Sequence, residues 1–227
     1  MGQKIQNIFS DRSSLALRAF LREPEGEWTL GRLVEEGVSL GVSSEVLNRA
    51  EKLGYIERVR KGPQSYSRLI RKDVLLKDWL NAYQFERNQK TYYFYPKEDF
   101  LKTCVSVLRK KKVSYALTLF SASRLISPYV KDGRHFLYVD VNLKDAPSFF
   151  KELESEIGLY KLVKGGNVCF AVPYYSSSVF RDSQKIKGCS AVSNLQLYLD
   201  LMTFPPAGPE EANQLILHFK KKGISFV

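Results

Sequence analysis

A change in the hydrophobic pattern between residues 81 and 96 constrains the fold more than any other feature. Before it, apolar residues recur at the three- and four-residue spacing of short amphipathic helices; after it, β-rich apolar runs alternate with helical segments. Residues 91–96 (TYYFYP) are aromatic and end in a proline, which disfavours helix at the residue before it. We therefore predict an α+β protein with two domains, residues 1–90 and 91–227.

Three amphipathic helices are expected in the first domain. Two short ones precede a turn at residues 37–41, and the second of them begins at Thr29, whose hydroxyl is suited to capping a helix. The third begins at Ser43 or Ser44 and ends at Gly54, because glycine favours the left-handed conformation that terminates helices.

A basic hairpin follows the third helix. Residues 55–60 alternate between apolar and polar, residues 61–65 are of turn-forming types, and residues 66–70 form the returning strand before a closing helix at 73–83. This order of helix, helix, turn, helix and hairpin resembles the winged helix-turn-helix family. The resemblance implies that the third helix enters the DNA major groove while the hairpin tip lies along the backbone.

The charges of this region favour double-stranded DNA as its partner. Residues 45–72 hold eight Lys and Arg against three Glu. Asn48 and Arg49 are chemically able to pair with base edges, whereas the hairpin cations suit phosphate contacts. A protein-interaction module with a solvated charged face is the alternative, but a basic hairpin in this place favours DNA. The predicted DNA-binding residues are Ser43, Ser44, Asn48, Arg49, Lys52, Arg58, Arg60, Lys61, Gln64 and Arg68.

The second domain is predicted to alternate strands and helices. Strands are expected at residues 113–117, 136–141, 160–163 and 168–172, and helices at 98–108, 118–126, 146–157, 194–202 and 209–222. Gly165 and Gly166 are expected to form a hairpin turn between the last two strands.

This order of elements is similar to the nucleotidyltransferase core. Such enzymes place a Gly-Ser pair after the first strand and two metal-binding carboxylates on the next. The matching places here are residues 121–123 (SAS) and the pair Asp140 and Asn142, so the glycine and the second carboxylate are missing. We therefore expect a nucleotidyltransferase-like domain with no catalytic residues, no metal and no cofactor, in a protein that is not an enzyme.

Overall charge and cysteine content limit the compartment and the partners. The chain has 35 Lys+Arg against 24 Asp+Glu, a formal charge of +11 that attracts polyanions such as nucleic acid. No stretch has the roughly 20 apolar residues of a spanning helix, and residues 1–6 contain no apolar leader. Three cysteines without a CxxC pair suit reduced thiols. These features predict a cytoplasmic protein without a membrane partner.

A more specific resemblance covers roughly residues 91–218. The segments that carry it are residues 191–201 (AVSNLQLYLDL), 205–208 (PPAG) and 210–212 (EEA), with 115–130 and 139–140 upstream. They look like the closing signature and the central block of AbiEi-type antitoxins of type IV toxin–antitoxin systems. The sequence departs from the commoner pattern at Ala207, where many relatives carry Arg.

The resemblance implies a DNA-binding repressor of its own operon that counteracts a nucleotidyltransferase-like toxin, without a need for direct toxin binding. Two alternatives remain open. One is an active nucleotidyltransferase acting on RNA or a nucleotide, and the other is a basic accessory protein that binds nucleic acid by charge alone.

Overall fold

The computed structural model describes residues 8–127 and 132–227, and the chain divides into two compact units between Gln84 and Phe85. The division precedes the expected boundary at residue 90. Phe85 is fully buried in the second unit, where its ring packs against Tyr138 and Phe204 with centroid distances of 6.0 and 5.5 Å. The strand that follows it therefore belongs to the second unit and its sheet.

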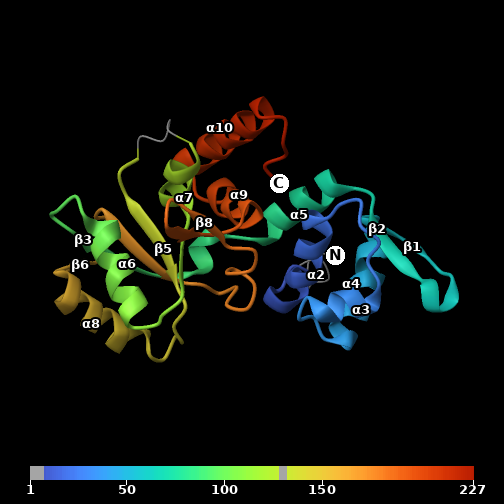
Figure 1. Cartoon of the computed structure of the whole chain (residues 1–227), viewed down its shortest axis with the longest axis horizontal. Helices are drawn as coiled ribbons and strands as arrows, with labels where there is room; N and C mark the ends of the chain where they lie inside the picture. The colour runs from blue at the N-terminus through green and yellow to red at the C-terminus, as the bar shows by residue number, and fades with distance from the viewer. Residues whose placement is uncertain (1–7, 128–131) are drawn as a thin grey trace. The chain divides into compact units, whose positions relative to one another are not determined.

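The first unit combines helices with a two-stranded ribbon (Figure 1). Its elements are α2 (Asp11–Arg22), α3 (Leu30–Glu35), α4 (Leu40–Lys52), β1 (Ile56–Val59), the short 3-10 helix η1 (Gly62–Gln64), β2 (Tyr66–Leu69) and α5 (Lys72–Ala82). Aromatic rings dominate its core: Phe20 packs on Trp28 and Phe9 on Trp79, with centroids 6.0 and 5.7 Å apart. Burial of such large rings is a strong source of stability in a small unit.

Helix α4 begins earlier than the sequence pattern indicated. Ser39 is its N-cap, and the Ser39 hydroxyl accepts a hydrogen bond from the backbone N–H of Val42. Ser43 and Ser44, the two predicted starts, lie inside the helix, and Ser43 is fully buried. The error arose at Gly41, which suggests a turn in the sequence but sits in the first helical turn. The predicted cap at Thr29 is confirmed, since its hydroxyl accepts from Arg32 N at 3.2 Å.

Strands β1 and β2 form the predicted hairpin, with Ile56 opposite Leu69 and Val59 opposite Tyr66. A short bridge joins β2 of this ribbon to the rest of the unit. Trp28 and Ser67 exchange two backbone hydrogen bonds of 2.9 Å, one in each direction. Because Ser67 lies opposite Arg58, the ribbon is anchored with one residue pair between this anchor and its turn.

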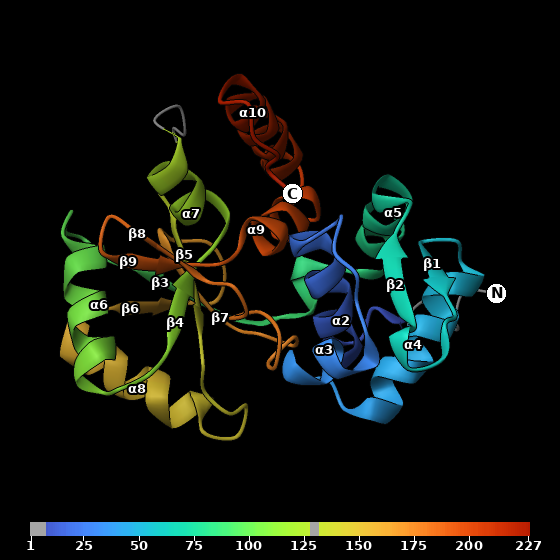
Figure 2. The ribbon, with the colours of Figure 1, turned by 45° about the vertical axis from the view of Figure 1, so that its right-hand side comes forward.

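The second unit is built on a mixed sheet with strand order β6-β3-β7-β5-β4-β9-β8. The strands are β3 (Gln89–Phe94), β4 (Tyr115–Leu117), β5 (His135–Val139), β6 (Tyr160–Leu162), β7 (Val168–Val172), β8 (Gln184–Ile186) and β9 (Cys189–Ala191). The helices are α6 (Phe100–Lys110), α7 (Leu119–Ile126), α8 (Ala146–Ile157), α9 (Asn194–Met202) and α10 (Ala207–Lys221), after the short 3-10 helix η2 (Phe85–Arg87). Helices α6 and α8 pack together, while α7, α9 and α10 form a separate group (Figure 2). The α+β class is confirmed.

The prediction of a hairpin turn at Gly165 and Gly166 is wrong. Strands β6 and β7 are not hairpin partners, because β3 lies between them and pairs antiparallel with both. The connection instead crosses the end of β3 so closely that a Cβ on Gly166 would lie 2.2 Å from the Tyr93 carbonyl oxygen. Strands β8 and β9 were not predicted, and residues 128–130 of the expected central block lie outside the described residues.

A buried carboxylate organises α9, the helix that carries most of the closing signature. Asp200 is fully buried and accepts hydrogen bonds from the Thr118 hydroxyl, from Tyr138 Oη at 3.0 Å and from Gln196 Nε2 at 2.8 Å. Tyr138 in turn accepts from Asn88 Nδ2 at 3.1 Å. Asp200 thus joins α9 to the start of α7 and to β5.

Candidate nucleic-acid interface

The predicted DNA-binding residues lie on α4 and on the ribbon, which spans residues 56–69. Most of them reach solvent, as the interface requires. Asn48, Lys52, Arg60, Lys61 and Gln64 are exposed, and Ser44, Arg49, Arg58 and Arg68 are partly exposed. Ser43 is the exception: its hydroxyl points inward and donates to the Val38 carbonyl at 3.4 Å. We therefore exclude Ser43 from the interface.

Two hydrogen bonds join the exposed face of α4 to the ribbon. Arg58 Nη1 donates to Asn48 Oδ1 at 2.6 Å, and Arg60 Nη2 donates to Glu51 Oε2 at 2.7 Å. The bond from Arg60 holds the pKa of Glu51 below its ordinary value. Helix and ribbon are therefore linked at two points through their polar side chains, a link that their spacing in the sequence did not reveal.

The bond from Arg58 changes what Asn48 can offer to a base. Asparagine pairs with adenine by accepting at Oδ1 and donating from Nδ2. Because Oδ1 already accepts from Arg58 on one of its two lone pairs, Asn48 keeps one acceptor position on Oδ1 and the N–H donors of Nδ2. Arg58 thus fixes the orientation of the amide without using up its hydrogen-bonding capacity.

Ion pairs divide the remaining cations into two groups. Arg49 is paired with Glu45 and Arg68 with Glu27, so a phosphate or a base would have to displace the carboxylate from each. Lys52 and Lys61 make no ion pair with any residue that the structure describes. Exposed pairs contribute little free energy, and this exchange is therefore cheap for the arginines.

The nucleotidyltransferase-like positions are not brought together in the second unit. Ser121 belongs to α7, and its Oγ accepts from Phe136 N, near the start of β5, at 2.7 Å. Strands β4 and β5 are antiparallel, with Leu117 opposite Leu137 and Tyr115 opposite Val139, so Asp140 follows the far end of β5. The prediction that Asp140 and Asn142 stand where such enzymes carry their carboxylate pair is therefore wrong. Sequence spacing does not reveal which end of β5 lies near Ser121.

The second unit also offers little acid–base or nucleophilic chemistry. Burial raises the pKa values of the Cys104 and Cys169 thiols to about 12, which keeps them protonated. Within residues 8–127 and 132–227 no group of three or more His, Cys, Asp and Glu side chains is arranged to hold a metal ion.

His135 predicts a specific pH dependence of stability. Burial, together with the neighbouring Arg124 guanidinium, lowers its pKa from 6.5 to about 4. Between these values the unfolded chain binds a proton that the folded protein does not, so stability falls as the pH drops from about 6.5 toward 4. We expect His135→Asn to flatten this part of the curve of unfolding free energy against pH, measured by urea denaturation. His218→Asn is the control, and an equal flattening by it would contradict the assignment.

Comparison with known proteins identifies the family. Residues 68–221 match a family of transcriptional regulators described as AbiEi antitoxins of type IV toxin–antitoxin systems. The match covers more than half of the chain, and the chain belongs to this family, which confirms the resemblance predicted from its sequence. No curated protein and no solved structure matches the chain. Within the described residues, no helix combines the length and the apolar character needed to cross a membrane.

Proposed function

We propose that the protein represses its own operon by binding operator DNA and acts as the antitoxin of a type IV toxin–antitoxin system. The first unit serves as a winged helix-turn-helix, with α4 as the reading helix and the ribbon as the wing. The observation that carries this proposal is the pair of bonds Asn48–Arg58 and Glu51–Arg60. They hold a polar helix face and a basic ribbon in one geometry, as simultaneous contact with a groove and its flanking phosphates requires.

Family membership supports the remainder of the proposal. A transcriptional regulator of this class belongs with a toxin, which we propose to be nucleotidyltransferase-like and encoded beside it. Neutralisation need not involve a stable complex of the two proteins. We propose that the second unit is a nucleotidyltransferase-like scaffold without catalytic activity, in keeping with the separation of Ser121 from Asp140.

The reading helix and the wing can be tested separately by titrating operator and random DNA at several salt concentrations. Arg49→Ala removes a predicted base contact, and we expect a cost of about 1–3 kcal/mol on the operator and little on random DNA. Lys61→Ala removes a phosphate contact, so we expect weaker binding to both DNAs and a salt slope lower by about one.

Lys77→Ala is a matched control, since Lys77 is an exposed cation on α5, outside the proposed interface. Equal losses on both DNAs for Arg49→Ala would show that α4 does not read the sequence. Equal affinity of the unaltered protein for operator and random DNA, lost steeply with salt, would instead identify a basic protein that binds by charge alone.

A further inference from the structure

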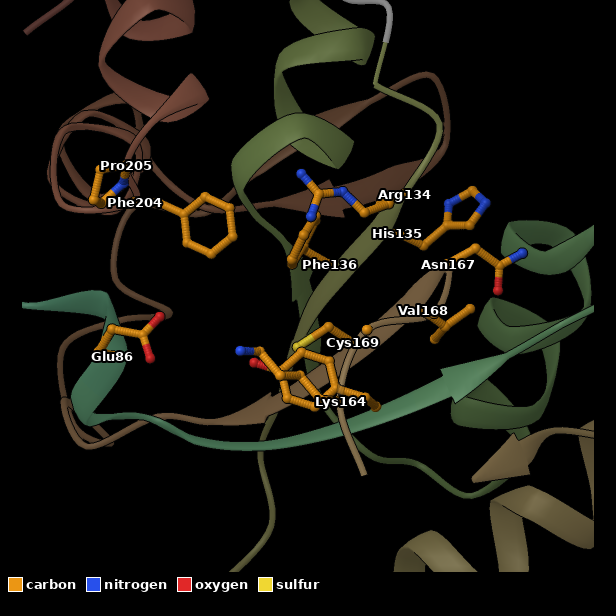
Figure 3. Close-up of a pocket in the computed structure, with 13 residues that line it drawn as sticks. Glu86, Arg134, His135, Phe136, Lys164, Asn167, Val168, Cys169, Phe204 and Pro205 are labelled. Atoms are coloured by element: carbon orange, nitrogen blue, oxygen red, sulfur yellow. The ribbon is translucent and has the colours of Figure 1, made fainter. Parts of the chain in front are cut away.

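A polar pocket of about 410 Å³ lies within the second unit, far in the sequence from the proposed DNA contacts (Figure 3). The start of β5, the connection between β6 and β7, and the segment after α9 form its walls. Figure 3 shows Arg134 and Lys164 directed into the space that Glu86 and Phe204 border. The pocket therefore combines two cations with aromatic surface.

Arg134 is fixed in place but keeps donors to offer. Asp132 Oδ2 accepts from its Nε at 3.0 Å and from its Nη2 at 2.7 Å, and the guanidinium lies 5.3 and 5.9 Å from the ring centres of Phe136 and Phe204. Among the described residues no acceptor is bonded to Nη1. An arginine held in this manner presents a preset N–H group to an anion, with little conformational entropy to lose.

Lys164 stands on a rigid turn. Gly166 has a φ of +83° and lies against the Tyr93 carbonyl, which excludes any side chain there. The Asn167 side chain accepts from Tyr95 N at 2.8 Å and donates to Tyr95 O at 2.7 Å. Lys164 itself is exposed and makes no ion pair with a described residue. The turn thus places the Lys164 ammonium at the pocket, and no ion pair of this ammonium with a described residue contributes to the fold.

Aromatic surface and a single carboxylate complete the pocket. Phe204 is only partly buried, which leaves part of its ring available for stacking. Burial raises the pKa of Tyr92 to about 12, so its hydroxyl remains a donor. Glu86 lies on the rim, where its carboxylate is paired with Lys90. This pair adds no net positive charge for further phosphates, and the carboxylate can still accept from a sugar hydroxyl or a base amino group.

We propose that this pocket binds a nucleoside 5′-monophosphate group, with the phosphate between Arg134 and Lys164 and the base against Phe204. Its volume lies within the range of small-ligand sites, about 300–1,000 Å³. The group can belong to a free mononucleotide or to the 5′-phosphorylated end of a strand, since both present the same phosphate, sugar and base.

Calorimetric titration of the full chain tests the proposal. The probes are AMP, CMP, GMP and UMP, their nucleosides, inorganic phosphate and ATP. We expect at least one monophosphate to bind about tenfold or more tightly than its nucleoside, inorganic phosphate or ATP. We expect Lys164→Ala to weaken that binding about tenfold, as loss of one charge-assisted contact does, and to leave nucleoside binding unchanged.

Lys161→Ala is the matched control, because Lys161 is an equally exposed lysine on β6 outside the pocket. The proposal is overturned if no monophosphate binds at millimolar concentration, if phosphate or nucleoside binds as well as the monophosphate, or if Lys161→Ala has the same effect as Lys164→Ala.

A 5′-phosphorylated tetranucleotide distinguishes the two sources of the ligand. It is titrated into the Lys61→Ala background, in which binding through the wing is weakened. Binding tighter than that of the mononucleotide, and lost with Lys164→Ala, assigns the pocket to strand ends; weaker binding assigns it to free nucleotide. Tetranucleotide binding that Lys164→Ala does not change, with no mononucleotide binding, overturns the proposal.

Discussion

Replacing Asp200 with alanine is expected to lower the free energy of unfolding by about 3 kcal/mol or more, because this carboxylate is fully buried at the centre of a hydrogen-bond network. The substitution leaves donors from Thr118, Tyr138 and Gln196 buried without their acceptor. Each buried donor that loses its partner costs about 1–3 kcal/mol. Thermal denaturation followed by circular dichroism should show a melting temperature lower by roughly 6–12 °C or more.

Two further variants make this result specific to the network. Asp200→Asn keeps one acceptor oxygen and should fall between the unaltered protein and Asp200→Ala. Asp140→Ala removes an exposed carboxylate and should change stability by less than about 0.5 kcal/mol. If Asp200→Ala is no more destabilising than Asp140→Ala, the network does not hold α9 in place.

The elements that the sequence predicted well are those whose signals are local. Helices α8 and α9 coincide with the expected residues 146–157 and 194–202, because a proline opens α8 and a glycine ends it, while Ser193 caps the start of α9. The ribbon was equally clear, since its turn residues separate two alternating segments. The start of α4 was missed because a glycine such as Gly41 is typical of loops but is also tolerated in the first turn of a helix, so the residue type alone does not distinguish the two.

What the sequence could not supply is pairing between distant segments. The insertion of β3 between β6 and β7 depends on residues far from the glycine turn, so that turn resembles a hairpin when seen alone. The same limitation produced the mistaken match of Asp140, whose distance from Ser121 depends on the direction of β5. The site residues on α4 and the ribbon were found from their chemistry, but the bonds that link them cross between elements.

Neighbouring glycines in the turn at 164–167 allow conformational strain to be separated from steric conflict. Gly165 and Gly166 have φ values of +82° and +83°, so an alanine at either position carries the same backbone penalty of about 1–2 kcal/mol. At Gly165 a Cβ would have nothing within 4 Å. At Gly166 it would lie 2.2 Å from the Tyr93 carbonyl oxygen, which belongs to β3 and pairs in the sheet.

We therefore expect Gly166→Ala to destabilise the protein by at least about 2 kcal/mol more than Gly165→Ala, since relief of the conflict requires β3 to move away from its partners. Urea denaturation of the two variants measures the difference directly. Equal destabilisation would mean that the connection does not cross β3 closely. A large difference in unfolding free energy between the two variants would support close packing of the Gly166 backbone against β3. This packing, which no local sequence signal predicts, fixes the turn that carries Lys164.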